Sequence, residues 1–192
     1  LKENGSVVSW GSDYSGGNSS SVSDQLASGV SQIFSTDIAF AALKEDGSVT
    51  TWGGGNDGGD SSSVSDQLSS GVSQIFSTFN AFAALKDDGS VVTWGLSYGG
   101  DSSAVASQLS SEVSQIFSTE YAFAALKKDG SVVTWGDMVG NSSSVASQLS
   151  SGVSQIFSNA SAFAALKEDG SVVTWGSNYG GGDSSAVSDQ LS

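Results

Sequence analysis

The hydrophobic positions along this chain of 192 residues return in the same order about every 42 residues. Residues 72–95 show one copy of the pattern. Residues 72–78 form a short apolar run rich in β-forming residues, residues 81–86 form a second run, and residues 90–94 form a third that is rich in β-branched side chains. Short runs of this composition, bounded by Gly, Asp and Ser, predict three β-strands in each copy.

An Asp-Gly pair separates the second run from the third in each copy. Glycine adopts the positive φ that a tight turn demands, so this pair between two β-forming runs predicts a β-hairpin. The pairs are Asp46-Gly47, Asp88-Gly89, Asp129-Gly130 and Asp169-Gly170, and Asn4-Gly5 takes their place in the first copy.

A Gly-rich loop follows the third run and closes on Asp or Asn. Serines come next, followed by a Val and, four residues later, a Leu, as in Val64 and Leu68. An Asp or Asn side chain can cap the first N–H groups of a helical turn, and Val and Leu at this spacing would then face inward. The segment is therefore either a single helical turn or an extended outer strand, and the sequence leaves both open.

A Trp-Gly pair recurs throughout the chain, at Trp10, Trp52, Trp94, Trp135 and Trp175, with spacings of 42, 42, 41 and 40 residues. This period predicts a single repeat domain over residues 1–192. Its units cover about 1–42, 43–84, 85–125 and 126–165, with a partial unit at 166–192. Leu1 falls in the middle of a unit, as expected for a mature fragment or for part of a longer array.

The strings Gly-Val-Ser-Gln-Ile-Phe-Ser-Thr and Ala-Phe-Ala-Ala-Leu-Lys-Glu-Asp-Gly-Ser-Val-Val-Thr-Trp-Gly resemble the repeat of the RCC1-like (regulator of chromosome condensation) β-propellers. That repeat has a V-x-x-I-x-x-G segment, an A-L-x-x-D-G-x-V hairpin and a closing W-G. The resemblance runs over the whole chain. It implies an all-β fold of propeller blades, each made of short antiparallel strands with the inner strand facing a central channel. The number of repeat units predicts about five blades, in an array that is either incomplete or open.

The chain also departs from that family. The units carry Phe40 and its equivalents where His is common, and the G-Q-L-G that usually follows the W-G is absent. Only some members have nucleotide-exchange activity, and the residues for it cannot be placed here. Because a shared fold does not carry function, the resemblance implies architecture and no functional residue.

The two ends of the array do not complete a ring. The last unit stops before its Val-Ser-Gln-Ile-Phe-Ser and Ala-Phe-Ala-Ala-Leu-Lys stretches, and Leu1 begins just after the same stretch. About one and a half strands are missing where the ends would meet, so either another segment supplies them or the array is open and continues into a neighbour. An unpaired strand edge is a template for pairing, which makes self-association into a filament one expectation.

The aromatic residues recur as regularly as the strands. We expect the Trp at the end of each third run, together with Ile75, Phe76 and Phe82, to pack between neighbouring blades. Stacking of sugar rings on the Trp side chains is the alternative.

Composition excludes several classes of function. The chain has no His and no Cys, so neither a Ser-His-Asp nor a Cys-His nucleophile can be built. The Asp residues of the hairpins are explained as turn formers, and we expect no enzymatic activity. Six Lys against 20 Asp and Glu give a net charge of −14, which repels nucleic acid and favours basic partners. No apolar run approaches the roughly 18 residues that span a bilayer, so no membrane insertion is expected.

Calcium is the one cofactor that the loops suggest. Residues 54–60 are Gly-rich and acidic, and hard oxygen ligands suit Ca²⁺, so Asp57 and Asp60 are candidate ligands. The corresponding loops at 96–101 and 137–141 contain few carboxylates. Asp60 and its equivalents are therefore also explained as caps that follow a Gly turn, and we expect no other cofactor.

The units differ at two places on a nearly identical framework. The loop after Trp-Gly has 7, 7, 6, 5 and 7 residues up to its Asp or Asn, and the pair before Ala-Phe reads Asp37-Ile38, Phe79-Asn80, Glu120-Tyr121 and Ala160-Ser161. Loops that vary on a fixed scaffold usually hold binding specificity, while neutral drift of an exposed surface is the alternative. The candidate binding residues are the large side chains at these places: Tyr14, Phe79, Tyr98, Tyr121, Met138 and Tyr179.

These observations favour a non-catalytic structural or interaction module of a secreted or cell-surface assembly, with copies of itself or other protein chains as partners. Near-identical units suit a building material or an adhesin, and the acidic, Arg-free composition is compatible with an extracellular setting. The competing interpretation is a ligand-binding module. It would be either lectin-like, with glycan bound by the loop tyrosines, or a calcium-dependent adhesin.

Overall fold

The computed structural model describes residues 1–191, with the side chain of Met138 outside the described part. Its strands form four three-stranded antiparallel sheets, each built from consecutive strands. The strands are β1 (Val30–Ser35), β2 (Ala39–Lys44), β3 (Val49–Gly53), β4 (Val72–Ser77), β5 (Ala81–Lys86), β6 (Val91–Gly95), β7 (Val113–Ser118), β8 (Ala122–Lys127), β9 (Val132–Gly136), β10 (Val153–Ser158), β11 (Ala162–Lys167) and β12 (Val172–Gly176).

Short helices lie between the sheets and at both ends of the array, and none of the described ones is long and apolar enough to cross a membrane. They are α1 (Ser97–Gly100) and the 3₁₀ turns η1 (Asp13–Ser15), η2 (Ser20–Val22), η3 (Gly55–Asp57), η4 (Ser62–Val64), η5 (Ser103–Val105), η6 (Met138–Gly140), η7 (Ser143–Val145), η8 (Asn178–Gly180) and η9 (Ser185–Gln190).

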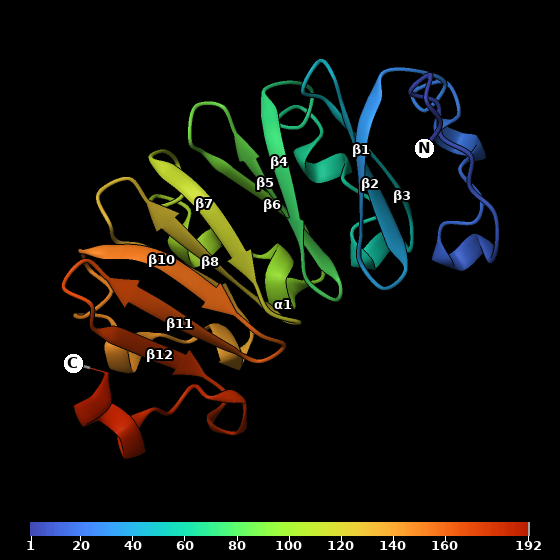
Figure 1. Cartoon of the computed structure of the whole chain (residues 1–192). Coiled ribbons are helices and arrows are strands. Elements are labelled where there is room, and N and C mark those ends of the chain that lie inside the picture. The colour runs from blue at the N-terminus through green and yellow to red at the C-terminus, as the bar shows by residue number, and fades with distance from the viewer. Residues whose placement is uncertain (192) are drawn as a thin grey trace.

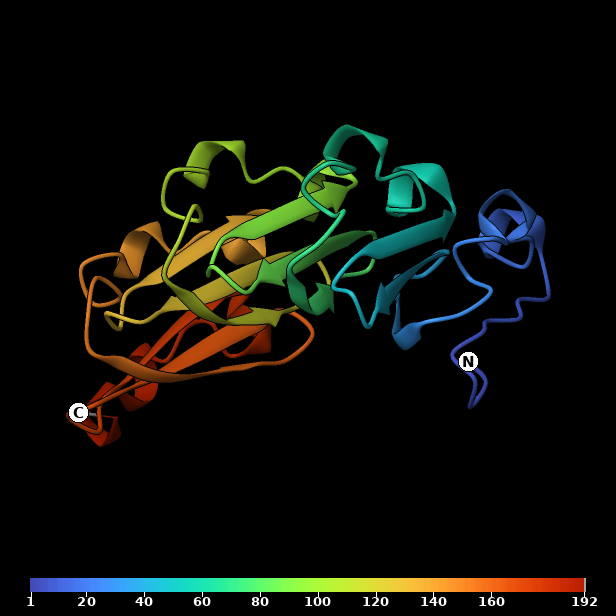
Figure 2. The ribbon, with the colours of Figure 1, turned by 90° about the horizontal axis from the view of Figure 1, so that it is seen from above.

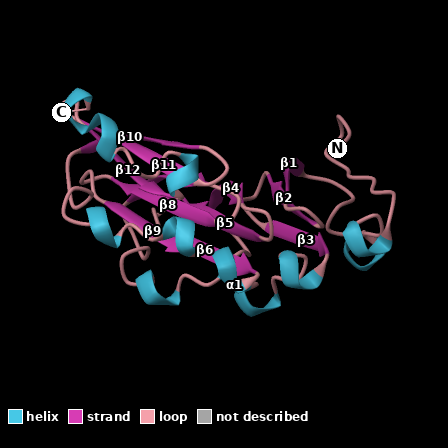
Figure 3. Cartoon of the chain, turned by 90° about the horizontal axis from the view of Figure 1, so that it is seen from below, coloured by secondary structure: helices cyan, strands magenta, loops and turns pink. Residues whose placement is uncertain are grey.

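The four sheets stand side by side as an open fan, with the chain termini at opposite ends of the arc (Figure 1). The first strands of successive sheets contact one another along the inner side, and the short helices follow the outer side (Figure 3). Residues 1–29, termed the half-unit, lie beyond β1–β3 without a sheet of their own (Figure 2). The predicted all-β array of blades with short antiparallel strands is confirmed, as four complete blades and a half-unit.

The Asp-Gly pairs form the turn between the second and third strand of each blade, as the sequence predicts. In the second blade Gly89 has a φ of 79°. Asp88 Oδ1 accepts hydrogen bonds from the backbone N–H of Ser90 at 2.9 Å and from its hydroxyl at 2.6 Å. These bonds favour the carboxylate and hold the pKa of Asp88 below its ordinary value of 3.8.

This hairpin predicts a response to acid. Because the pKa of Asp88 is lowered in the folded state, its hydrogen bonds stabilise the fold above a pH of about 4 and lose that contribution as the pH falls through the folded-state pKa. Ser90→Ala should raise the pKa of Asp88 toward 3.8, because the hydroxyl of Ser90 is the largest cause of the shift. Ser131→Ala, which removes the same bond at Asp129, should leave Asp88 unchanged. A carboxyl-carbon NMR titration measures this, and a wild-type Asp88 that titrates at 3.8 would contradict it.

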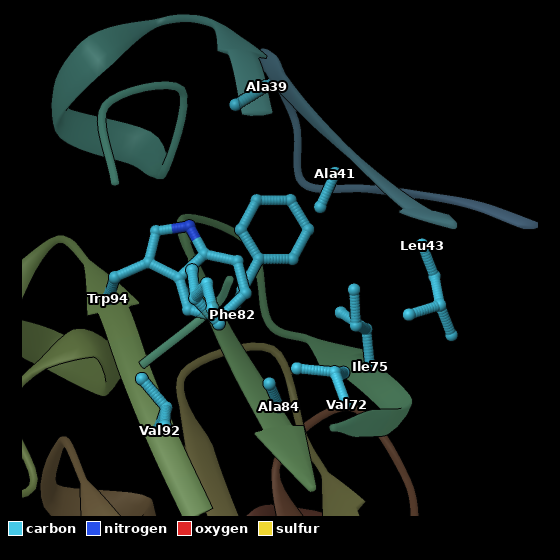
Figure 4. Close-up of a cluster of buried hydrophobic side chains, with 10 residues drawn as sticks. Ala39, Ala41, Leu43, Val72, Ile75, Phe82, Ala84, Val92 and Trp94 are labelled. Carbon is cyan, nitrogen blue, oxygen red and sulfur yellow. The ribbon is translucent and has the colours of Figure 1, made fainter. Parts of the chain in front are cut away.

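The core lies between neighbouring blades. Between the first and second blade, Ala39, Ala41 and Leu43 of β2 face Phe82 and Trp94 of the next sheet (Figure 4). The rings of Phe82 and Trp94 stack with centroids 5.2 Å apart, and both side chains are buried. Equivalent clusters fill the next two interfaces. The predicted packing between blades is confirmed for Trp52, Trp94, Trp135 and Trp175.

Trp10 is the exception, and its predicted burial is wrong. Its side chain is 84% exposed. Trp10 belongs to the half-unit, and no described blade precedes the half-unit to cover its indole. Position in the array, which the repeat pattern does not encode, therefore decides whether the recurring Trp is buried.

The segment after each Gly-rich loop contains a 3₁₀ turn and no outer strand, which settles the alternative that the sequence leaves open. Asp60 Oδ1 accepts the backbone N–H of Ser62, the first residue of η4, at 2.9 Å. Val64 packs against the core between the blades, and Leu68 is buried within it. Val49 donates its N–H to the carbonyl of Leu68 at 2.9 Å, so the turn is attached to the outer strand β3.

Candidate functional site

The two segments that vary between the units both lie at the same end of the blades, which is termed the rim end. Ala39 at the start of β2 pairs with Gly53 at the end of β3, and β1 ends opposite the start of β2. The connection 36–38 and the following Gly-rich loop therefore lie together, and Gly54 donates its N–H to the carbonyl of Ile38 at 2.8 Å. The Asp-Gly turns lie at the opposite end, termed the hairpin end.

Backbone hydrogen bonds join the four blades in a row at the rim end. The N–H of Asp37 donates to the carbonyl of Phe79 at 2.9 Å, and the N–H of Phe79 donates to the carbonyl of Glu120 at 2.7 Å. The N–H of Glu120 then donates to the carbonyl of Ala160 at 3.0 Å. These four residues, termed the rim row, are the first members of the variable pairs. These backbone hydrogen bonds fix the spacing of the four residues, whose side chains differ.

A polar residue before each rim-row position holds the connection in place. Thr78 Oγ1 accepts the N–H of Ala81 at 3.1 Å, and Thr36 and Thr119 make the same bond in their blades. In the last blade Asn159 accepts the N–H of Ala162 at 2.9 Å. These bonds pair one backbone N–H group in each connection and so hold the rim-row residues in place.

The rim row borders a hollow of about 410 Å³ on the inner side of the arc. All four blades contribute to its wall through the connections that follow their inner strands. The lining residues are Thr36, Asp37, Ser77, Thr78, Phe79, Ser118, Thr119, Glu120, Ser158, Asn159 and Ala160. The blades therefore form one shared site here.

One of the predicted binding residues, Phe79, lines this hollow, and a second, Tyr121, contacts Phe79. Phe79 stacks on Tyr121 of the neighbouring blade, with ring centroids 5.8 Å apart and planes inclined by 24°. Phe79 is 44% exposed and Tyr121 36%, so each ring is partly in solvent. Partly exposed aromatic side chains held in this way are typical anchors of protein interfaces.

The other predicted binding residues lie apart on the Gly-rich loops. Tyr14 in η1, Tyr98 in α1 and Tyr179 in η8 are all exposed. Among the described residues, no aromatic pair joins them to Phe79 or Tyr121. Met138 belongs to the same set, and its side chain lies outside the described residues. The predicted set therefore divides into a stacked pair at the rim row and separate loop residues.

The rim row also carries charge that was absent from the predicted binding set. Asp37 and Glu120 lie on either side of Phe79 in the row, and both are exposed. The available signal was their position, because each occupies the same place in its variable pair as Phe79. All lysines of the chain lie at or beside the hairpin turns: Lys2, Lys44, Lys86, Lys127, Lys128 and Lys167. Negative charge at the rim end is therefore not offset by nearby lysine.

The calcium candidates do not form a cluster. Asp60 Oδ1 accepts the N–H of Ser62, which lowers the pKa of Asp60. The backbone carbonyl of Asp57 accepts the hydroxyl of Thr36 at 3.0 Å. Within residues 1–191, no group of three or more His, Cys, Asp or Glu side chains is placed to hold a metal ion. Asp60 therefore pairs with the first N–H group of η4, which is the alternative to a calcium ligand that the sequence predicts.

No family model matches the chain, and no curated protein matches it. Solved structures do match. Prp20p from Saccharomyces cerevisiae superposes with a TM-score of 0.54 at 19% identity, over 81% of this chain and 45% of that one. Human WBSCR16 gives a TM-score of 0.52 at 22% identity, over 79% of this chain and 48% of that one. The chain spans less than half the length of either structure.

These neighbours define the class of fold as the RCC1-like β-propeller, since Prp20 is yeast RCC1. The resemblance based on the A-L-x-x-D-G-x-V hairpin and the closing W-G is therefore confirmed for the fold. At such low identity the likeness concerns the architecture of the blades.

Proposed function

We propose that the chain is a non-catalytic protein-interaction scaffold whose blades hold the rim end against a partner protein. One observation carries this proposal: the first residues of the variable pairs form one row along a shared hollow, where Phe79 is partly exposed and stacks on Tyr121 of the neighbouring blade. Neighbours of the same fold support it. Binding of Prp20p to Gsp1p and histones is described with its structure, and Prp20 is also known bound to Kap60.

The partner that suits this surface carries Lys or Arg. Asp37 and Glu120 flank the aromatic pair, and the lysines of the chain lie at the other end of the blades. A cationic side chain over Phe79 would gain a cation–π interaction of about 0.5–2 kcal/mol, together with attraction to the two carboxylates. The net charge of −14 would also draw a basic segment toward the chain.

Peptides selected from a random display library against the wild-type chain are expected to be rich in Lys and Arg. Phe79→Ala should weaken their binding roughly 10- to 30-fold, because removing a central aromatic anchor from an interface costs about 2 kcal/mol. Asp37→Asn combined with Glu120→Gln should reduce the dependence of the affinity on salt. Fluorescence polarisation with labelled peptides measures both effects.

Tyr179→Ala is the matched control, since it removes a fully exposed aromatic side chain from a Gly-rich loop. It should change the affinity less than about twofold. Peptides that lose affinity with Tyr179→Ala and keep it with Phe79→Ala would contradict the rim site. They would favour the loop tyrosines, which are the surface that a lectin-like module would use.

A further inference from the structure

Two carboxylates of the rim row lie on either side of an aromatic ring. Asp37 and Glu120 flank Phe79 in the row, and both are exposed. Hydrogen-bonded backbone segments lie about 5 Å apart, so the backbones of the two acidic residues are about 10 Å apart with Phe79 between them. Within residues 1–191, no lysine lies at this end of the blades. The two carboxylates are therefore placed to receive a cation from a partner on the same ring.

Phe79 offers that cation one aromatic face. Its ring stacks on Tyr121 with centroids 5.8 Å apart and planes inclined by 24°, so Tyr121 covers one of its two faces. The ring also remains partly in solvent, since Phe79 is 44% exposed and lines the hollow. Among the described residues that line the hollow, Phe79 alone is aromatic. The site therefore presents a single flat aromatic surface and does not surround a cation with several rings.

Hydroxyl groups supply further oxygen atoms beside the ring. Ser77 at the end of β4 and Ser118 at the end of β7 both line the hollow and are half-buried. The oxygen of a serine hydroxyl has two lone pairs that accept hydrogen bonds. Acceptors thus reach the hollow from two neighbouring blades, in addition to the two carboxylates of the rim row.

These features distinguish between the two basic side chains that a partner can offer. The guanidinium of Arg is planar, stacks on aromatic faces and carries five N–H donors on different edges of its plane. It can lie on Phe79 and still direct donors to both Asp37 and Glu120. The ammonium of Lys is a compact, strongly hydrated point charge. It pairs with one carboxylate at a time and has no flat face to place on the ring.

We propose that the rim end takes an arginine side chain from its partner, in preference to lysine. The guanidinium lies on the open face of Phe79, and its N–H groups are directed to Asp37, Glu120 and the hydroxyls of Ser77 and Ser118. This inference rests on the proposed function, because it names the residue of the partner that the same site binds. It adds a preference between two side chains of equal charge, which attraction to the net charge of −14 does not produce.

Two labelled peptides of equal length and charge test the proposal by fluorescence polarisation at low salt. One is Gly-Ser-Arg-Ser-Gly-Arg-Ser-Gly, and the other has Lys in place of each Arg. The Arg peptide is expected to bind the wild-type chain roughly fivefold more tightly, or better. Phe79→Leu keeps an apolar side chain but removes the aromatic face, so it should reduce this preference to less than about twofold. Tyr179→Ala is the matched control and should leave the preference unchanged.

Circular dichroism checks that each variant folds. Equal affinities of the two peptides for the wild-type chain would overturn the arginine preference, and so would a preference that persists in Phe79→Leu. Either result leaves the rim site standing as long as Phe79→Ala weakens the binding of both peptides. If Phe79→Ala weakens neither peptide, or if neither peptide binds the wild-type chain, the proposed function fails together with this inference.

Discussion

Replacing Phe82 with alanine is expected to lower the free energy of unfolding by about 3–5 kcal/mol, the range for deleting a buried Phe side chain. Phe82 has no exposed surface, stacks on Trp94 and fills the space against Ala39 and Ala41 of the preceding blade. Its loss opens a cavity in the cluster that forms the core between these two sheets. Urea unfolding followed by Trp fluorescence measures the change.

Phe157→Ala is the matched control for this substitution. The side chain of Phe157 is 58% exposed on the last blade, so its removal should cost less than about 1 kcal/mol at concentrations where the chain is monomeric. Equal losses for the two variants would contradict a fold whose stability comes from packing between successive blades.

Trp94→Phe is expected to destabilise the chain more than Trp175→Phe, by about 1–3 kcal/mol. Both Trp side chains are buried and stack on a Phe at similar distance, 5.2 Å and 5.1 Å between centroids. Trp94 donates its Nε1–H to the carbonyl of Gly58, whereas the Nε1 of Trp175 is buried without a partner among the described residues. The first substitution thus removes a buried hydrogen bond, while the second removes an unpaired buried donor.

The Nε1 of Trp175 lacks a partner within residues 1–191 because one loop is shorter than its equivalents. The preceding Gly-rich loop, which would supply this carbonyl to Trp175, has only 5 residues (137–141), against 7 (54–60) in the loop that holds Gly58. Chemical denaturation of the two single variants in parallel measures the difference. A loss for Trp175→Phe equal to or larger than that for Trp94→Phe would show that the hydrogen bond to the loop carbonyl does not contribute to stability.

Much of the blade could be predicted from its sequence, because the decisive interactions there are local. The Asp-Gly pair fixes a turn through the positive φ of Gly89 and the bonds from Ser90 to Asp88. Large apolar side chains that recur in every unit are expected to be buried, and the neighbouring blade is the nearest apolar surface that can bury the Phe and Trp residues. Trp10 shows where this reasoning fails, since it lies in a similar unit at the edge of the array, where no described blade covers it.

The candidate site could be predicted only in part. Variation between the units identified Phe79 and Tyr121 as separate candidates, but the hydrogen bonds that align the rim row run between blades and leave no trace in the spacing of residues. Asp37 and Glu120 were therefore not grouped with them. The loop tyrosines matched the same description in sequence, although antiparallel pairing puts them on a different part of the rim end.

Amide hydrogen exchange of the wild-type chain, with and without a Lys- and Arg-rich peptide selected against it, tests the central claim most directly. The peptide is expected to protect the connections at 36–38, 78–80 and 119–121, which surround the hollow, and to leave the Asp-Gly turns at the opposite end unchanged. Protection confined to the Asp-Gly turns or to the Gly-rich loops would contradict a scaffold that binds its partner through the rim row.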